Sequence, residues 1–184
     1  MTGDDQAARL ARLAPAPELW HARQLGPTGC IYHAAYALLG DDTLLDHVQD
    51  VGTGAWIARL AQRGVVPYHL YATRQDPEGV PISPRGWEAV RSQAQRHRET
   101  VLSLLLTVDS TRYHGTHLVA AHVSHRALDA VRISDSVRPG IQDFTWAAFL
   151  ASPYARAWEV EQLVSLDLTR YAPEYYDPVP LETP

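Results

Sequence analysis

The chain contains a single cysteine, has no dense run of basic residues and has no long apolar stretch. One cysteine in 184 residues excludes an internal disulfide and a zinc site built from several thiolates. The net charge of −5, without a Lys/Arg run, argues against a nucleic-acid partner. The apolar runs are too short to span a membrane, and Met1–Asp5 lacks the basic and apolar regions of a signal peptide. We therefore expect a soluble, cytoplasmic protein that binds neither nucleic acid nor a membrane.

The composition fits one globular domain. With 184 residues, of which 46% are hydrophobic and 20% charged, the chain is long enough to bury a sizeable core. We expect a short helical extension over residues 1–19 and a main domain over residues 20–168. Residues 169–184 contain several prolines and polar residues, which predicts an extended or disordered tail.

The apolar pattern predicts helices in the first half of the chain. Residues Cys30–Leu39 are apolar on nearly every side, which is typical of a buried central helix. Thr28 is the expected N-cap of this helix, and Gly40 is the expected stop. Further helices are predicted at Thr43–Asp50, Gly54–Arg63 and Pro84–His97, and a short one at Trp146–Leu150.

Strand patterns dominate the second half. The most convincing central strand is Val101–Val108, and the runs His117–Val123 and Ala130–Ser134 are spaced for an antiparallel hairpin. Two more strands are predicted at Val65–Ala72, where Pro67 favours a sheet edge, and at Trp158–Leu166. Helices first and sheet later indicate the α+β class, with the buried cysteine-bearing helix packed on a C-terminal antiparallel sheet.

Cys30 is the first candidate for a functional residue because it lies at the predicted start of a helix. The dipole and the unpaired N–H groups of a helix N-terminus stabilise a thiolate. Gly26 and Gly29 allow another group to approach the backbone closely. Gln24 could add its side-chain amide to the Cys30 N–H to form an oxyanion hole. The pattern predicts a nucleophilic cysteine, although an isolated cysteine is most often a buried small hydrophobic residue.

A nucleophilic thiol needs a histidine base, and the chain has nine histidines. His21 and His33 are close in sequence to Cys30, but a histidine three residues along the same helix faces the wrong way for proton transfer. His117 follows a polar loop and opens a strand of small and apolar residues. We therefore predict that His117 is the base, with His114 as the second choice.

A third group should fix the tautomer of the imidazole and stabilise the imidazolium. Asp135 follows the strand that is expected to pair with the His117 strand. In an antiparallel hairpin the end of the second strand returns beside the start of the first, so Asp135 is predicted to lie next to His117. Asp143 is the other acid considered for this role, and an aspartate before a turn is otherwise most simply a turn residue.

These residues together carry a resemblance to a known family. Gln24 and Cys30 before a buried helix, then His117 opening a strand, then Asp135 before Pro139-Gly140 and a short aromatic-bearing helix, resemble the papain-like cysteine peptidase superfamily. More narrowly, they are similar to the bacteriocin-leader (double-glycine) peptidases and their free-standing relatives, over about residues 20–165. In that family a proline usually stands at the position of Ser136.

The resemblance implies a papain-like fold over residues 20–168 and a cysteine hydrolase that cleaves a peptide or amide bond. It also implies the roles of the site residues: Cys30 is the nucleophile, His117 the base, Asp135 the orienting acid and Gln24 the oxyanion donor. The expected partner is a peptide or acyl substrate, and no cofactor is expected. The double-glycine specificity is not carried over, because nothing like the usual transporter is present.

Three alternatives stay open. The same acyl-enzyme intermediate can pass its acyl group to an amine, which would make the protein an acyltransferase or a cyclase. A catalytically dead binding module is the second. A metal site is the third, since His114 and His117 form one close pair, His122 and His125 form another, and Asp109 or Asp129 could add an oxygen ligand. On a strand, however, His117 and His122 point to opposite faces.

Overall fold

The computed structural model describes residues 18–50, 52–72, 80–96, 101–109, 115–124 and 130–165. The extension predicted over residues 1–19 lies outside these ranges except for its last two residues, and the predicted tail, 169–184, lies wholly outside them. Among the described helices, none combines the length and the apolar character needed to cross a bilayer.

A single antiparallel sheet organises the described residues. Its strand order is β1-β6-β2-β3-β4-β5, so the last strand in the sequence is inserted between the first and the second. β1 lies at the edge, where the missing N–H of Pro67 is tolerated. The strands are β1 (Val65–Ala72), β2 (Val101–Asp109), β3 (Thr116–Ser124), β4 (Ala130–Ser134), β5 (Ile141–Thr145) and β6 (Glu159–Ser165).

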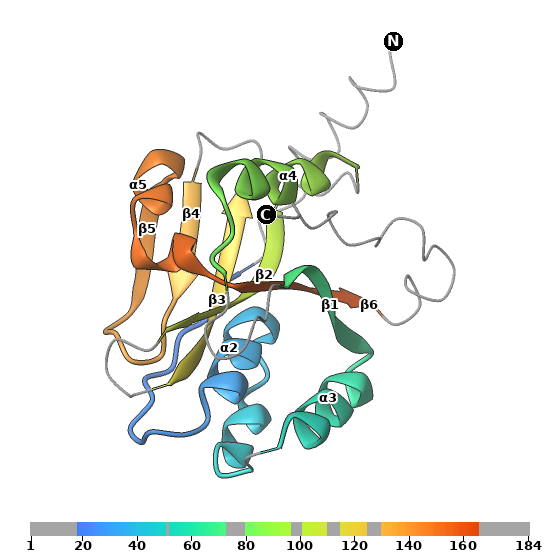
Figure 1. Ribbon diagram of the computed structural model, residues 1–184. Helices are drawn as coiled ribbons and strands as arrows, with labels where there is room; N and C mark the ends of the chain where they lie inside the picture. The colour runs from blue at the N-terminus through green and yellow to red at the C-terminus, as the bar shows by residue number, and fades with distance from the viewer. Residues whose placement is uncertain are drawn as a thin grey trace.

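Helices cover both faces of this sheet (Figure 1). On one face lie α2 (Cys30–Leu39), the 3₁₀ helix η1 (Asp42–His47) and α3 (Thr53–Gln62). On the other face lie α4 (Pro84–Arg96) and α5 (Trp146–Leu150), followed by the 3₁₀ helix η2 (Pro153–Arg156). The α2 helix packs directly on β3, which places the start of α2 near the start of that strand.

The alternation of side chains along β2 divides the core into two clusters. Leu104 and Leu106 belong to the cluster beneath α4 and α5, whereas Leu105 belongs to the cluster beneath α2 and α3. All three leucines are fully buried. Because successive residues of a strand point to opposite faces, an almost continuously apolar strand is expected in a sheet that is covered on both sides.

The α+β class is confirmed, and the predicted β3–β4 hairpin is present. The prediction that helices come first and the sheet later is only partly right, because α4 and α5 lie between strands and cover the second face. The strand β5 was not predicted, and the helix predicted at Thr43–Asp50 is a 3₁₀ helix at Asp42–His47.

Candidate active site

A left-handed glycine sets the start of the cysteine-bearing helix. Gly29 is the N-cap of α2 with φ of 92°, and Cys30 is the first residue of the helix. The prediction of Thr28 as the N-cap is therefore wrong: the chain turns through a left-handed residue, which glycine adopts without steric cost. A Cβ at position 29 would also lie 2.7 Å from the Cβ of Val48. The helix ends as expected at Gly40, with φ of 69°.

The base candidate and the acid candidate lie in direct contact. His117 is the second residue of β3, and β4 runs antiparallel to β3, so the chain leaving β4 at Asp135 returns beside it. The Nε2 atom of His117 donates to Oδ1 of Asp135 at 2.8 Å, and both side chains are about 95% buried. The contact predicted between these two residues from the hairpin geometry is therefore present.

Cys30 and His117 are linked by a hydrogen bond between the thiol and the imidazole. Because Nε2 of His117 is engaged with Asp135, the ring nitrogen facing the thiol is Nδ1. Burial alone raises the pKa of Cys30, but the hydrogen bond with His117, a backbone hydrogen bond from Leu118 and the charge of His117 outweigh it. The net pKa of the thiol is therefore below its usual value, which favours the thiolate.

The environment stabilises the protonated form of His117. Burial lowers the pKa of His117, but hydrogen bonds with Asp135 and Cys30 and the charges of these two groups raise it to about 9. Burial also raises the pKa of Asp135, and the hydrogen bond and charge of His117 reverse this and lower it below the usual range. These shifts favour a thiolate–imidazolium pair backed by a carboxylate.

Asp135 is held by two further donors that the sequence did not indicate. The Val137 N–H donates to its Oδ1 at 3.1 Å, and the Tyr154 hydroxyl donates to its Oδ2 at 2.8 Å. Tyr154 belongs to η2 and is buried. Asp143, the other acid considered, forms a surface ion pair with Arg132 at 3.1 Å and its side chain is 74% exposed.

Gln24 is buried and fixed by three hydrogen bonds. Its backbone N–H donates to the Ser136 carbonyl at 2.8 Å, and its Oε1 accepts from the Ser136 hydroxyl at 2.9 Å. Its Nε2 donates to the Gly26 carbonyl at 2.7 Å, which leaves the second hydrogen of that nitrogen. Ser136 directly follows Asp135, so neighbouring residues hold the base and the amide.

A cleft of about 440 Å³ opens onto Cys30 and His117. Trp56 and Thr53 of α3 line it. Sequence reasoning missed three titratable side chains of the lining, which come from the edge strand β1 and its neighbour β6: His69, Glu159 and Glu161. These three residues form no motif in the sequence, because only the pairing of β1 with β6 brings them together.

The metal site considered from the sequence lies largely outside the part of the chain that the structure describes. His114, His125 and Asp129 lie outside the described residues. His122 is buried next to the Ser103 hydroxyl at 3.3 Å, and burial together with the charge of Arg132 lowers its pKa to about 4. Among the described residues, the one group of three metal-ligand side chains is the His69, Glu159 and Glu161 set.

His21 and His33 also lie near this region, but neither is linked to Cys30 by a hydrogen bond among the described residues. His21 Nδ1 lies 3.0 Å from the Ser134 hydroxyl, and its Nε2 accepts from the Gly140 N–H at 3.1 Å. Burial lowers the pKa of His33, and the charges of His21 and His117 lower it further. His21 therefore connects the segment before α2 to β4 and the turn after it.

Comparisons of this chain with models of known protein families, with curated proteins and with solved structures found no match.

Proposed function

We propose that this protein is a cysteine hydrolase that cleaves a peptide or amide bond. The observation that carries the proposal is the hydrogen-bonded series of Cys30, His117 and Asp135, in which the pKa of the thiol is lowered and that of the imidazole is raised to about 9. A buried series of this kind is what nucleophilic catalysis by cysteine requires. The cleft beside Cys30 and His117 provides access for a substrate.

In the first half of the reaction the Cys30 thiolate attacks the carbonyl carbon of the substrate. A carbon–sulfur bond forms and the carbonyl oxygen becomes an oxyanion. The carbon–nitrogen bond then breaks as His117 transfers its Nδ1 proton to the leaving amine, and a thioester remains on Cys30. Asp135 keeps the opposite nitrogen of His117 protonated, so that Nδ1 stays directed at the sulfur.

In the second half, neutral His117 takes a proton from water as the hydroxide adds to the thioester carbonyl. Collapse of this intermediate breaks the carbon–sulfur bond, releases the acid and restores the thiolate–imidazolium pair. The backbone N–H of Cys30, at the start of α2, and the remaining Nε2 hydrogen of Gln24 are the proposed donors to the oxyanion in both halves.

We further propose that the chain is a distant relative of the papain-like cysteine peptidases, on the residues that carry the resemblance described above. The helix that begins with the cysteine and packs on an antiparallel sheet bearing the histidine supports this. We also place the protein in a reducing compartment such as the cytoplasm, because its catalytic thiol must stay reduced.

The test is the pH dependence of Cys30 alkylation by iodoacetamide, followed by intact mass. The wild-type protein should react rapidly well below pH ~8, where an ordinary thiol is protonated. His117→Ala should lose this reactivity. His122→Ala is the matched control, because His122 is equally buried on the same strand and lies against the Ser103 hydroxyl instead of Cys30. A Cys30 that titrates like a free thiol in both wild type and His117→Ala would overturn the proposal.

Acylation provides the second measurement. With p-nitrophenyl acetate the wild-type protein should release a burst of nitrophenolate and carry one acetyl group on Cys30, and Cys30→Ser should lose this fast thioester-forming burst. Adding a simple amine then separates the two reactions of the thioester, since hydrolysis gives acetate and transfer gives the acetamide. Absence of the burst in a protein whose Cys30 alkylates rapidly would show a reactive thiol without hydrolase activity.

A further inference from the structure

The wall of the cleft formed by β1 and β6 carries three titratable side chains. Glu159 and Glu161 are two residues apart on β6 and therefore point to the same face of the sheet, and His69 pairs directly with Glu161 in the ladder. Nδ1 of His69 lies 3.3 Å from Glu159 and 3.4 Å from Glu161. All three line the cleft that holds Cys30 and His117.

Glu161 is buried with few polar partners. The residue is only 8% exposed, and among the described residues its carboxylate is paired with Nδ1 of His69 at 3.4 Å, which is shared with Glu159. Glu159 also accepts from the Thr107 hydroxyl at 3.1 Å. A buried carboxylate with so few donors is costly and gains from a cation brought into the cleft.

The charge of the two glutamates is also unbalanced. Burial and the charge of Glu159 raise the pKa of Glu161 to about 7. No lysine or arginine lines the cleft within the described part of the chain. The side chain in contact with both glutamates is that of His69, which is 56% exposed.

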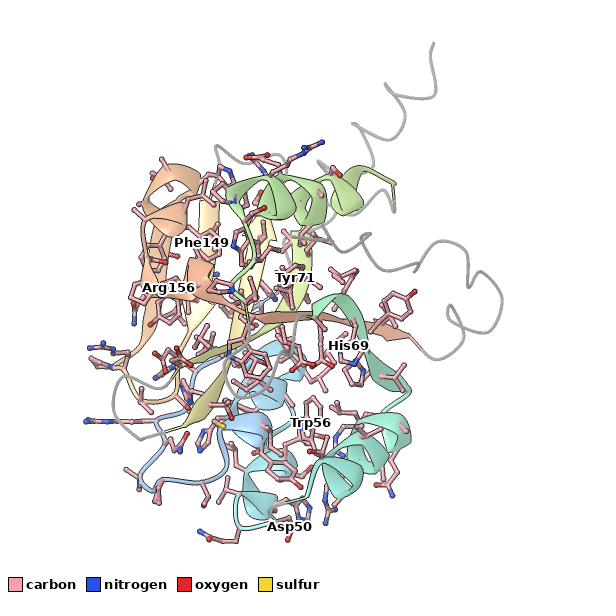
Figure 2. The ribbon with its side chains drawn as sticks, viewed as in Figure 1. Asp50, Trp56, His69, Tyr71, Phe149 and Arg156 are labelled. Carbon is pink, nitrogen blue, oxygen red and sulfur yellow. The ribbon has the colours of Figure 1, made fainter. Side chains whose placement is uncertain are left out.

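The other lining residues suit an organic cation. Trp56 and Trp158 contribute indole rings to the same cleft, and such rings attract guanidinium and ammonium groups. Figure 2 shows His69 on β1 and Trp56 on α3 lying one above the other on the same side of the molecule. At about 440 Å³ the cleft is far larger than a single ion needs and accommodates a side chain together with its peptide.

We propose that Glu159 and Glu161 bind the guanidinium or ammonium group of a basic side chain, so that the substrates of this site are basic peptides. The inference rests on the proposed cysteine hydrolase function, and it assigns the two glutamates as specificity residues. A guanidinium has five donors and so satisfies both carboxylates, which the single Nδ1–H of His69 does not.

The test uses internally quenched peptides of alanine and glycine in which one arginine is placed at successive positions on either side of the scissile bond. Each peptide has a matched partner with citrulline, which has the shape of arginine without its charge. At one position the kcat/KM for arginine should exceed that for citrulline by about tenfold or more, the size expected of one charge-assisted pair. Glu161→Gln should abolish this preference, so that the arginine and citrulline values become equal. Glu159→Gln should reduce it, and Asp143→Asn, an exposed acid outside the cleft, should not.

Calorimetric titration of the same peptides into Cys30→Ala keeps this inference separate from the catalytic proposal. Tighter binding of the arginine peptide, lost in the double variant with Glu161→Gln, supports the cation site even if no peptide is cleaved. Equal binding and equal turnover of arginine and citrulline peptides overturn it. Stoichiometric Zn²⁺ binding that depends on Glu161, without discrimination of arginine, also overturns it and identifies the three side chains as a metal site.

Discussion

Replacing Asp135 with asparagine removes the negative charge beside His117 while keeping an oxygen that accepts from its Nε2–H. Burial lowers the pKa of His117, and the hydrogen bond with Asp135 is the largest of the contributions that raise it. Without the carboxylate we expect this pKa to fall from about 9 to 6.5 or below. At pH ~7.5 the imidazolium fraction then drops from nearly all to about a tenth or less. Cys30 loses its cationic partner to the same extent, so its alkylation rate should fall about tenfold or more.

The same change should appear in stability, with a defined pH dependence. The folded-state pKa of His117 lies above its ordinary value of 6.5, so its stabilisation is complete below that value and is lost as the pH rises to about 9. The pKa of Asp135 is lowered, so its contribution is complete above its ordinary value of 3.8 and is lost as the pH falls through its folded-state pKa. The difference in unfolding free energy between wild type and Asp135→Asn should therefore be greatest between the two ordinary pKa values, from pH 3.8 to pH 6.5.

The size of that difference follows from the raised pKa. Moving a pKa from 6.5 to about 9 corresponds to about 3 kcal/mol of differential interaction, and because Cys30 supplies part of it, Asp135→Asn should lose less than about 3 kcal/mol. Urea unfolding at a series of pH values measures it, and Asp143→Asn serves as the control, because its surface pair with Arg132 is worth under about 1 kcal/mol. If Asp135→Asn kept wild-type alkylation at pH ~7.5 and showed a pH-independent stability loss, Asp135 would be a structural residue with no control over His117.

Three more predictions concern the residues around this series. Tyr154→Phe deletes the buried hydroxyl that donates to Asp135 at 2.8 Å, so urea unfolding should show a loss of about 1.5–3 kcal/mol, and an unchanged midpoint would contradict the importance of that bond. Gly29→Ala places a Cβ 2.7 Å from that of Val48 on a residue with φ of 92°, so the unfolding free energy should fall by more than about 1 kcal/mol and Cys30 should alkylate more slowly. A variant with wild-type stability and wild-type alkylation would refute the strain argument. Ser136→Ala removes the hydroxyl that holds Gln24, so the nitrophenolate burst should slow several-fold while alkylation, which forms no oxyanion, keeps its wild-type rate; parallel loss of both rates would point to a general structural defect.

The parts of the fold that the sequence predicts well are those governed by local patterns. Continuous apolar runs identify α2 and β2, and Gly40 ends its helix where expected. The contact of His117 with Asp135 follows from a single hairpin, which is also a local feature. β5 escapes prediction because its five residues alternate only weakly, with no residue fully buried.

The parts that the sequence does not predict depend on contacts between distant segments. Tyr154 of η2 reaches Asp135 from a segment that follows β5 and α5, and no sequence periodicity predicts that contact. His69 meets Glu161 only because β6 is inserted beside β1, some ninety residues away in the chain. The helix begins one residue later than predicted, with Gly29 instead of Thr28 as the N-cap. Residue preferences at caps do not locate a helix end to a single position.

Asp135 and Ser136 are joined by one peptide bond, and a turn closed by the Arg138 N–H and the Asp135 carbonyl at 2.9 Å fixes their directions. Asp135 accepts the hydrogen bond from His117, and the Ser136 hydroxyl donates to the Gln24 side chain. Under the proposed mechanism, a rotation of that single peptide plane would therefore disturb both the base and the oxyanion donor, whereas a side-chain substitution at either residue affects only one of them. Transplanting this chemistry to another scaffold accordingly requires moving residues 135–138 as one block.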